Sequence, residues 1–503
     1  MKIPKLKSAS SIADEIINLI SELVSIYKDK NREAYLIIDK NGIVIYLYEI
    51  ERIDLLLRKV FIWHFKRTVK SADIKTAREA LIALAEDCTD IKPVAVRIHK
   101  DCDTLYYDLW DGHNTIVQVS PNHKRRTILQ QSSNFCFRRD GTMQAQVIPN
   151  FKANISDFLK IITEFVNVVE SQLILVAVYL CAAFIPDINH PILIVEGEKG
   201  AGKSSALRFF SKLINPVTKD LLVLPKDTTS LVTVLSNNYY VAFDNVGNIS
   251  DEICNVLCQS VTGGCLSKRK LYSDNTEISL NLRRLVALNG ISMHIRQTDL
   301  LDRTIMVYLK RISPDKRATE EDIEKSFSEK LPDILGCVFQ ILAKALEVYK
   351  SVNLQDLPRM ADYAKYGYCI AEAIKKGYGE EFLKQYTENQ RFATESTVGD
   401  NPVLDCVRHI VEKHGYWKGS MTELLHKMRT ILTENYISGA IPKGFPQNAS
   451  SLSRKLKSLE PDLQILQIKI NIGRDSERYV ELGDPGNAIL DGNDGIDDDF
   501  YNF

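Results

Sequence analysis

The sequence lacks a zinc-binding pattern of cysteines. Its ten cysteines are scattered, and no two of them form a C-x-x-C pair. Cys254, Cys258 and Cys265 are close together, but no histidine pair completes a tetrahedral ligand set. Such usage is typical of free thiols in a reducing compartment, so a disulfide-rich secreted class is excluded and a cytoplasmic protein is expected.

The chain also lacks long apolar runs and a large net charge. The most apolar segment, residues 173–185, is too short to span a bilayer, and we expect a buried helix there. The first residues lack the apolar core of a signal peptide. With 64 basic and 65 acidic residues the formal net charge is −1, so any surface that binds nucleic acid must be a local one. No membrane partner is expected.

At 503 residues the chain is too long for one core, and about three or four domains are expected. We predict an α+β region over residues 1–150 that serves as a collar or a partner surface. Its expected elements are a helix over 10–27, a hairpin over 34–48, helices over 54–66 and 74–85, and short strands at 94–98, 104–109, 116–119 and near 135–138.

Two aspartates in this region resemble a metal site. Asp101 and Asp103 could hold the metal ions of a primase or polymerase. They also fall in the predicted turn between two strands, where aspartate is common. We favour the turn and keep the metal site as the alternative. A helical lead-in follows over residues 151–190, with helices expected at 155–169 and 171–184.

The most specific motif lies in residues 191–205. An apolar run at 192–195 predicts a buried strand, and residues 206–213 have helical spacing. The segment between them fits G-x-x-x-x-G-K-[ST] at every fixed position, which defines a P-loop. The expected nucleotide-binding residues are Gly197, Glu198, Lys199, Gly200, Ala201, Gly202, Lys203, Ser204 and Ser205.

Each residue type in this loop suits phosphate binding. Glycines let main-chain N–H groups surround phosphates, and the helix N-terminus adds a positive dipole end. Lys203 is expected to reach the β- and γ-phosphates, and Ser204 to ligate Mg²⁺. ATP and Mg²⁺ are therefore the predicted cofactors.

Two further apolar runs end in polar residues. Asp244 follows the run 239–243 and is expected to hold Mg²⁺; the alternative is a helix cap. Asn289 follows the run 285–288 and is expected to position the attacking water against the γ-phosphate; the alternative is a turn before Gly290. Polar residues at the carboxyl ends of parallel strands meet at the ligand-binding edge of a sheet.

An arginine precedes the next apolar run, at 304–309. Arg303 could reach the γ-phosphate of a neighbouring subunit, and Arg296 is a second candidate. The alternative for Arg303 is an ion pair with Asp299 or Asp302. Between Asp244 and Asn289, a β-like segment with a turn carries Lys268, Arg269, Lys270 and Tyr272. These residues are expected to contact DNA phosphates and to stack on a base; the alternative is a solvated charged face.

The order of these parts resembles the superfamily 3 helicase core, the AAA+ ATPase of small DNA viruses, phages and plasmids. The resemblance covers residues 191–312 and implies an α/β P-loop core that forms rings, usually hexamers, around DNA. Leu300-Leu-Asp-Arg303 is similar to the arginine-finger segment of that family, and Lys268 to Lys270 match its pore hairpin. One departure is Asn245, where many AAA+ ATPases have glutamate. Three alternatives follow for the carboxylate that polarises the attacking water. Asp244 could serve both there and at Mg²⁺, Glu252 could supply the carboxylate, or hydrolysis could be slow.

A looser resemblance, to ATPases of phages and integrated mobile elements that include the helicase parts of primase-helicases, is carried by two segments. They are residues 358–363, and the segment from Trp417 through 422–425 and 445–446 to 451–456. We expect a helical domain over 313–400 and a winged helix over 401–482. Arg454, Lys455, Lys457 and Arg474 would touch DNA; the alternative is a solvated helix face. The tail, 483–503, is expected to be disordered and acidic, and it resembles the tip of bacterial single-strand-binding proteins; the alternative is a solubilising tail.

The sequence therefore predicts a ring-forming, ATP-driven DNA helicase or translocase in the replication of a phage, plasmid or integrated mobile element. Its expected partners are DNA, further copies of itself, and a primase, polymerase or single-strand-binding protein. Two alternatives remain. One is an origin-binding or loader protein that uses ATP as a switch, and the other is a regulatory P-loop ATPase that acts on proteins.

Overall fold

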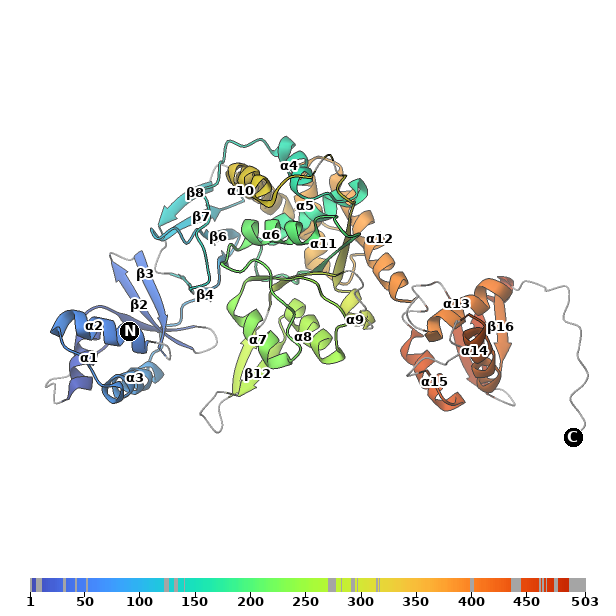
Figure 1. Cartoon of the computed structure of the whole chain (residues 1–503), viewed down its shortest axis with the longest axis horizontal. Coiled ribbons are helices and arrows are strands. Elements are labelled where there is room, and N and C mark those ends of the chain that lie inside the picture. Colours follow the sequence, from blue (N-terminus) through green and yellow to red (C-terminus); the bar gives the residue numbers. More distant parts are fainter. Residues whose placement is uncertain are drawn as a thin grey trace, which may run out of the picture. The chain divides into compact units, whose positions relative to one another are not determined.

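The structure is a computed structural model with two compact units, Met1–Ile291 with Ile305–Tyr386, and Ser292–Thr304 with Thr387–Phe503 (Figure 1). It describes residues 2–5, 11–29, 33–40, 43–50, 53–121, 126–130, 134–139, 141–269, 277–281, 283–290, 295, 297–313, 315, 317–398, 402–435, 445–460, 463, 466, 468–474 and 478–487. Within these residues, no helix combines the length and apolar character that crossing a membrane requires.

The first part of the chain has a hydrophobic core of its own, built from residues between Ile3 and Cys88. Ser11 caps the first helix, and Asp14 completes the capping box. The predicted helix over 10–27 ends early, because Ser25–Lys28 pairs antiparallel with β2. The elements are α1 (Ile12–Ser21), β1 (Ser25–Lys28), β2 (Ala34–Lys40), β3 (Ile43–Glu49), α2 (Asp54–Phe65) and α3 (Ser71–Glu86).

A β-rich module follows. Its antiparallel sheet has the order β5-β6-β7-β8, while β4 and β9 pair in parallel. The predicted strand 94–98 is divided, because Arg97 adopts a left-handed φ of 66° between β4 and β5. Asp101 ends β5, and Asp103 lies in the tight turn to β6 that the sequence predicted. Strand β8 was not predicted. The strands are β4 (Val94–Ala95), β5 (Ile98–Asp101), β6 (Thr104–Asp108), β7 (Thr115–Val119), β8 (Arg126–Gln130) and β9 (Cys136–Phe137).

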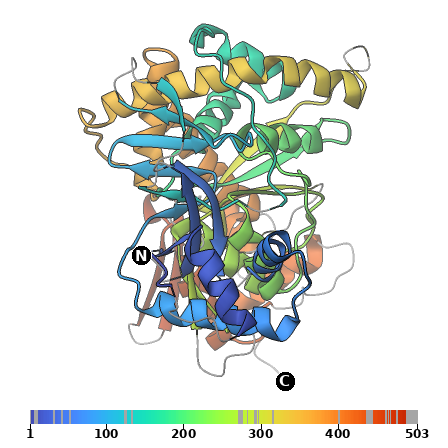
Figure 2. The ribbon, with the colours of Figure 1, turned by 90° about the vertical axis from the view of Figure 1, so that its left-hand side faces the viewer.

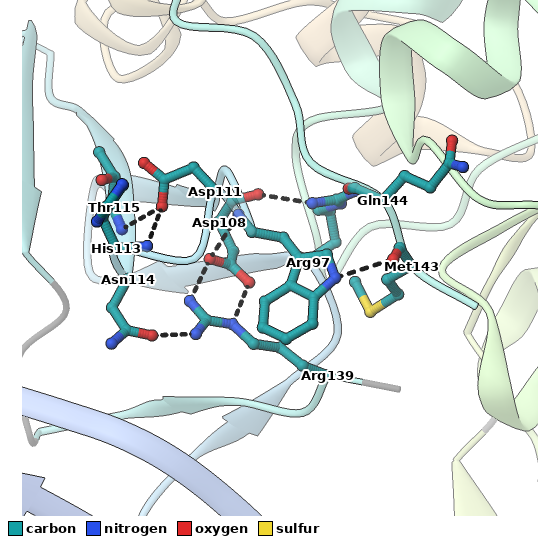
Figure 3. Close-up of polar contacts among 10 residues, drawn as sticks. Arg97, Asp108, Asp111, His113, Asn114, Thr115, Arg139, Met143 and Gln144 are labelled. Atoms are coloured by element: carbon teal, nitrogen blue, oxygen red, sulfur yellow. Dashed lines mark hydrogen bonds and ion pairs between the residues drawn. The ribbon is translucent and has the colours of Figure 1, made fainter. Parts of the chain in front are cut away.

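Arg97 joins this module to the P-loop part of the chain. Its side chain is fully buried, and its Nε donates to Asn215 Oδ1 at 3.1 Å. It also donates to the main-chain oxygens of Asp108, Gln144 and Pro216. Nearby, the buried Asp108 carboxylate forms an ion pair with Arg139 (Figure 3). A buried charge is stable only when hydrogen bonds or ion pairs satisfy it. The four hydrogen bonds of the Arg97 side chain therefore explain why this residue keeps its left-handed conformation.

The P-loop lies in a mixed α/β core whose central sheet has the order β11-β14-β10-β15. Strands β10, β14 and β11 run in parallel. Figure 1 shows α5 and α6 on one side of this sheet and α7 and α8 on the other. The elements are η2 (Ile155–Asp157), α4 (Phe158–Phe165), η3 (Glu170–Gln172), α5 (Leu173–Ala182), β10 (Ile192–Gly197), α6 (Lys203–Ile214), α7 (Thr228–Asn237), β11 (Tyr240–Phe243), α8 (Asp251–Thr262), β14 (Leu285–Asn289) and β15 (Thr304–Leu309).

Helix α5 is buried along its whole length, as its apolar sequence predicted. The helix predicted over 155–169 is shorter, ending at Phe165. A hairpin of β12 (Cys265–Arg269) and β13 (Glu277–Asn281) stands between α8 and β14. After β15 come α10 (Glu320–Tyr349), seen in gold along one side of the first unit in Figure 2, then α11 (Ala361–Ile374) and α12 (Tyr378–Val398).

In the second unit, α13, α14 and α15 share one hydrophobic core with a three-stranded antiparallel sheet. The sheet order is β16-β18-β17. Strand β16 was not predicted from the sequence. The elements are α9 (Thr298–Leu301), α13 (Pro402–His414), β16 (Tyr416–Gly419), α14 (Met421–Asn435), α15 (Ala449–Ser458), β17 (Ile470–Arg474), β18 (Arg478–Gly483) and η5 (Pro485–Asn487).

Candidate nucleotide site

The loop between β10 and α6 requires glycine at three positions. Gly197, Gly200 and Gly202 have φ angles of 147°, 81° and 80°. A side chain at Gly197 would place its Cβ 2.6 Å from the main-chain oxygen of Leu309 on β15. Since L-residues rarely adopt these angles, the loop can turn round a phosphate only with glycine at these places.

Lys203 and Ser204 form the first turn of α6. Lys203 Nζ donates to the main-chain oxygens of Gly197 and Glu198, at 2.6 and 3.0 Å, so its ammonium group lies over the loop. Ser204 Oγ donates to Asp244 Oδ1 at 3.0 Å. This contact brings the hydroxyl of the P-loop helix to the carboxylate at the end of β11. Hydroxyl and carboxylate oxygens are the ligands that Mg²⁺ prefers.

Strand register explains why Asp244 and Asn289 are neighbours. Asn289 pairs with Val195 on β10, and Phe243 pairs with Leu288. Asn289 therefore lies between the P-loop strand and the acidic strand, at their carboxyl ends. Polar groups at this edge of an open parallel sheet meet where ligands bind.

The side chain of Asn289 is held in a fixed orientation. It is 2% exposed, and its Oδ1 accepts the main-chain N–H of Asn245 at 2.8 Å. Its Nδ2 is buried without a hydrogen-bond partner among the described residues. The hydrogen bond to Oδ1 fixes the orientation of the amide and leaves Nδ2 as the group that can donate to a ligand.

Asn245 has a structural reason to be asparagine. Its φ of 55° is left-handed, a conformation that asparagine tolerates better than most residues. Its contact with Asn289 uses the main chain alone. The side chain that departs from the family pattern thus takes no part in this hydrogen bond.

A cavity of about 450 Å³ opens at this edge of the sheet. It is lined by Lys199, Gly200, Ala201, Gly202, Lys203, Ser204, Ser205, Asp244, Asn245, Asn289 and Gly290. Most of the sequence-predicted nucleotide residues are therefore brought together, with Gly197 and Glu198 at the start of the loop. The unpartnered Asn289 amide, the glycine cradle and the oxygens of Ser204 and Asp244 fit a nucleotide phosphate with a divalent cation.

Two glutamates are candidates for the carboxylate that Asn245 does not supply. Glu252 is exposed in the first turn of α8 and is not among the described residues that line the cavity. Glu196, next to Gly197 on β10, was not singled out from the sequence. Burial raises the pKa of Glu196, and Lys203 partly opposes this shift. An acidic residue at the end of an otherwise apolar strand is the signal that could have drawn attention to it.

Arg303 belongs to the second compact unit. Its Nη1 donates to the main-chain oxygen of Asp299 at 2.6 Å and forms an ion pair with the Asp299 carboxylate. The side chain is 13% exposed. The ion pair that the sequence offered as an alternative to contact with a neighbouring subunit is thus present within a single chain. Arg296 lies outside the described residues.

The predicted DNA contacts fall into two groups. Lys268 and Arg269 lie in β12, where they pair with Ile278 and Glu277 of β13, while Lys270 and Tyr272 lie outside the described residues. In the second unit, exposed cations lie on α15, and one arginine ends β17. These are Arg454, Lys455, Lys457 and Arg474. The tail predicted to be disordered from residue 483 begins later, because Gly483 ends β18 and Pro485–Asn487 form η5; from residue 488 onward it lies outside the described residues.

Two family models match this chain. Residues 156–382 match the actinomycete integrative conjugative element replication protein, and residues 403–490 match the AICE RepA C-terminal domain. No match was found among curated proteins.

Solved structures also show similarity, at low values. The C-terminal region of NrS-1 matches with a TM-score of 0.37 and 10% identity, over 92% of this chain and 96% of that one. SCCmec type IV Cch, described as an active helicase, matches with a TM-score of 0.43 and 13% identity, over 92% and 93%. This chain is thus similar, over residues 156–382 and 403–490, to the replication proteins of actinomycete integrative conjugative elements.

Proposed function

We propose that this protein is an ATP-driven DNA helicase or translocase that acts in the replication of a phage, plasmid or integrated mobile element. The observation that carries the proposal is the single cavity in which the P-loop, Asp244 and Asn289 converge. The match to a replication protein of an integrative conjugative element supports the biological setting.

The polar side chains and the glycines of the cavity have separate roles in this proposal. Lys203 binds the β- and γ-phosphates, and Ser204 and Asp244 hold Mg²⁺. When bound, Mg²⁺ would supply positive charge that offsets the negative charge developing on the phosphate. Asn289 Nδ2 donates to the γ-phosphate or to the attacking water, since its oxygen is occupied by Asn245. The loop glycines present main-chain N–H groups to the phosphates.

DNA contact is assigned to the β12–β13 hairpin. Its strand β12 brings Lys268 and Arg269 toward the turn, and cations there grip a DNA backbone without reading its sequence. In this proposal further copies of the chain form a ring, usually a hexamer. Arg303 then leaves Asp299 and acts on the γ-phosphate bound by the neighbouring subunit.

The C-terminal unit is proposed to be a winged helix. Its order of helix, strand, two helices and two strands, with β16 beside β18, supports this assignment. The exposed cations of α15 would then face duplex DNA.

A second function, an ATP-gated origin-binding or loader protein, rests on one observation. Among the described residues that line the cavity, Asp244 supplies the only carboxylate, and Asn245 cannot accept a proton. Slow hydrolysis would leave ATP as a switch rather than as fuel.

Steady-state ATP hydrolysis with and without single-stranded DNA separates these functions. A motor should be stimulated strongly by DNA and inactive as Lys203→Ala. Tight ATP binding with negligible turnover would favour the loader. Hydrolysis that ignores DNA, and survives alanines at Lys268, Arg269 and Lys270, would instead indicate an ATPase that acts on proteins.

A further inference from the structure

A second polar cavity lies at the opposite edge of the central sheet. It has a volume of about 280 Å³ and is lined from the starts of β11 and β14, from the loop before β10, and from the β4–β5 segment. The nucleotide cavity, in contrast, is at the carboxyl ends of the same strands. The polar residues that line the second cavity include Asp29, His99, Lys100, Asp187, His190, Arg283 and Arg284.

Two arginines give this cavity positive charge. Arg283 donates through Nη1 and Nη2 to the main-chain oxygens of Asp187 and Thr262. Arg284 donates through Nε to the oxygen of Leu235 at 2.9 Å and through Nη1 to that of Arg283. Among the described residues, neither guanidinium forms an ion pair with a carboxylate, although Asp29 and Asp187 also line the cavity. Both side chains are half-buried, and the oxygens that they contact are neutral, so an anionic ligand would offset their charge.

His190 supplies a hydrogen-bond acceptor. The residue is 3% exposed, and its Nε2 lies 2.8 Å from the main-chain oxygen of Ile185. A carbonyl oxygen can only accept, so Nε2 carries the hydrogen and Nδ1 keeps a lone pair. Burial and Arg283 lower the pKa of His190 to about 4, which keeps the ring neutral at pH 7.

Two polar atoms beside this cavity lack partners. They are His190 Nδ1, an acceptor, and Arg283 Nε, a donor, and both are buried. A ligand that satisfies both offers a hydrogen to Nδ1 and an acceptor oxygen to Nε, and the charges of Arg283 and Arg284 favour an anionic one. Hydrogen phosphate has this combination, whereas a phosphodiester has no hydroxyl to donate.

We propose that this cavity is a second phosphate site, which takes hydrogen phosphate or a protonated phosphate monoester between Arg283, Arg284 and His190. The ligand could be free phosphate or the phosphorylated end of a nucleic acid strand. Arg283 and Arg284 connect β13 to β14, so a phosphate bound there lies at the base of the hairpin that carries Lys268 and Arg269. The site does not depend on the function proposed above.

Calorimetric titration of the full-length chain with sodium phosphate at pH 7 and constant ionic strength tests the site. Lys203→Ala is present throughout, to weaken phosphate binding at the P-loop. Arg283→Met and Arg284→Met should each weaken phosphate binding at least about tenfold, because each removes a charge-assisted hydrogen-bond donor. Arg58→Met is the matched control, since Arg58 also donates to a main-chain oxygen, that of Val69, but lies outside the cavity.

Nuclear magnetic resonance keeps the test independent of the variants' folding. The ¹⁵N resonance of His190 Nδ1, assigned by its loss in His190→Gln, should shift when phosphate is added to the otherwise unchanged chain. Tighter binding of a 5′-phosphorylated oligonucleotide than of its 5′-hydroxyl form would identify a strand end as the source; equal binding of the two, with phosphate still bound, would identify free phosphate. Absent phosphate binding, an unmoved His190 resonance, or undiminished binding by both arginine variants overturns the proposal.

Discussion

Asn289 offers the sharpest test of the nucleotide site, because its two side-chain atoms have separate roles. Oδ1 accepts from the main chain of Asn245, and Nδ2 is the buried, unpartnered donor. Asn289→Asp keeps the acceptor and replaces the donor with an anionic or protonated oxygen. Asn289→Leu removes both and leaves the Asn245 N–H without its acceptor, at a cost to folding of about 1–3 kcal/mol.

We expect Asn289→Asp to keep the hydrogen bond from Asn245 N–H while its kcat for ATP falls about 100-fold, the loss typical of one donor to a developing negative charge. Asn289→Leu should lose both activity and stability. The assays are steady-state hydrolysis and thermal melting, with binding of a fluorescent ATP analogue as a check on the site. Asn238→Asp is the control, since its amide donates to Val234, outside the cavity. Hydrolysis by Asn289→Asp within about threefold of the unchanged chain would refute the role given to Nδ2 and leave Asn289 as a turn residue.

Three further predictions follow from the same contacts. Asn245→Gly should hydrolyse ATP within about twofold of the unchanged chain, because glycine adopts the left-handed φ and keeps the N–H that Asn289 accepts; a large loss in steady-state rate would give the Asn245 side chain a direct role. Arg303→Ala and Lys203→Ala should each be inactive, yet activity should return when the two variants are mixed, because one supplies the P-loop and the other the arginine; no recovery in assembled mixtures would place Arg303 outside a shared site. Glu196→Gln should raise the melting temperature at pH 7 and leave it unchanged near pH 3. Burial holds the folded pKa of Glu196 above its unfolded value, so the ionised form destabilises the fold only above about pH 4; an unchanged melting temperature at pH 7 would contradict this reasoning.

Local patterns in the sequence were enough to find the strand, loop and helix of the P-loop. The apolar run before Gly197 and the helical spacing after Ser204 correspond to β10 and α6. The apolar runs that end at Asp244 and Asn289 likewise correspond to β11 and β14. Their adjacency could only be expected by analogy, because strand order depends on contacts between residues far apart in sequence.

Other features depend on tertiary contacts that no local pattern shows. Residues 25–28 continue the apolar spacing of α1, yet they form β1 because β2 offers hydrogen bonds to this segment. Arg97 divides a predicted strand because its guanidinium finds carbonyl and amide oxygens on three other segments. Strand β16 is only four residues long, too short for a clear alternation.

The candidate site shows the same division. Residue types at the P-loop predicted phosphate chemistry, since glycine, lysine and serine at that spacing have few other uses. The departure at Asn245 was visible in the sequence, but its left-handed φ was not. Similarly, the sequence offered both Asp299 and Asp302 as ion-pair partners of Arg303, and only the structure shows the pair with Asp299.

Strand displacement on a forked DNA duplex tests the central claim most directly. The full-length chain with ATP and Mg²⁺ should separate the strands, and it should fail as Lys203→Ala or with alanines at Lys268 and Arg269, although the hairpin variant should still bind ATP. Hydrolysis that is normal in every chain with an intact P-loop, without any strand displacement by the unchanged protein, would contradict the helicase account.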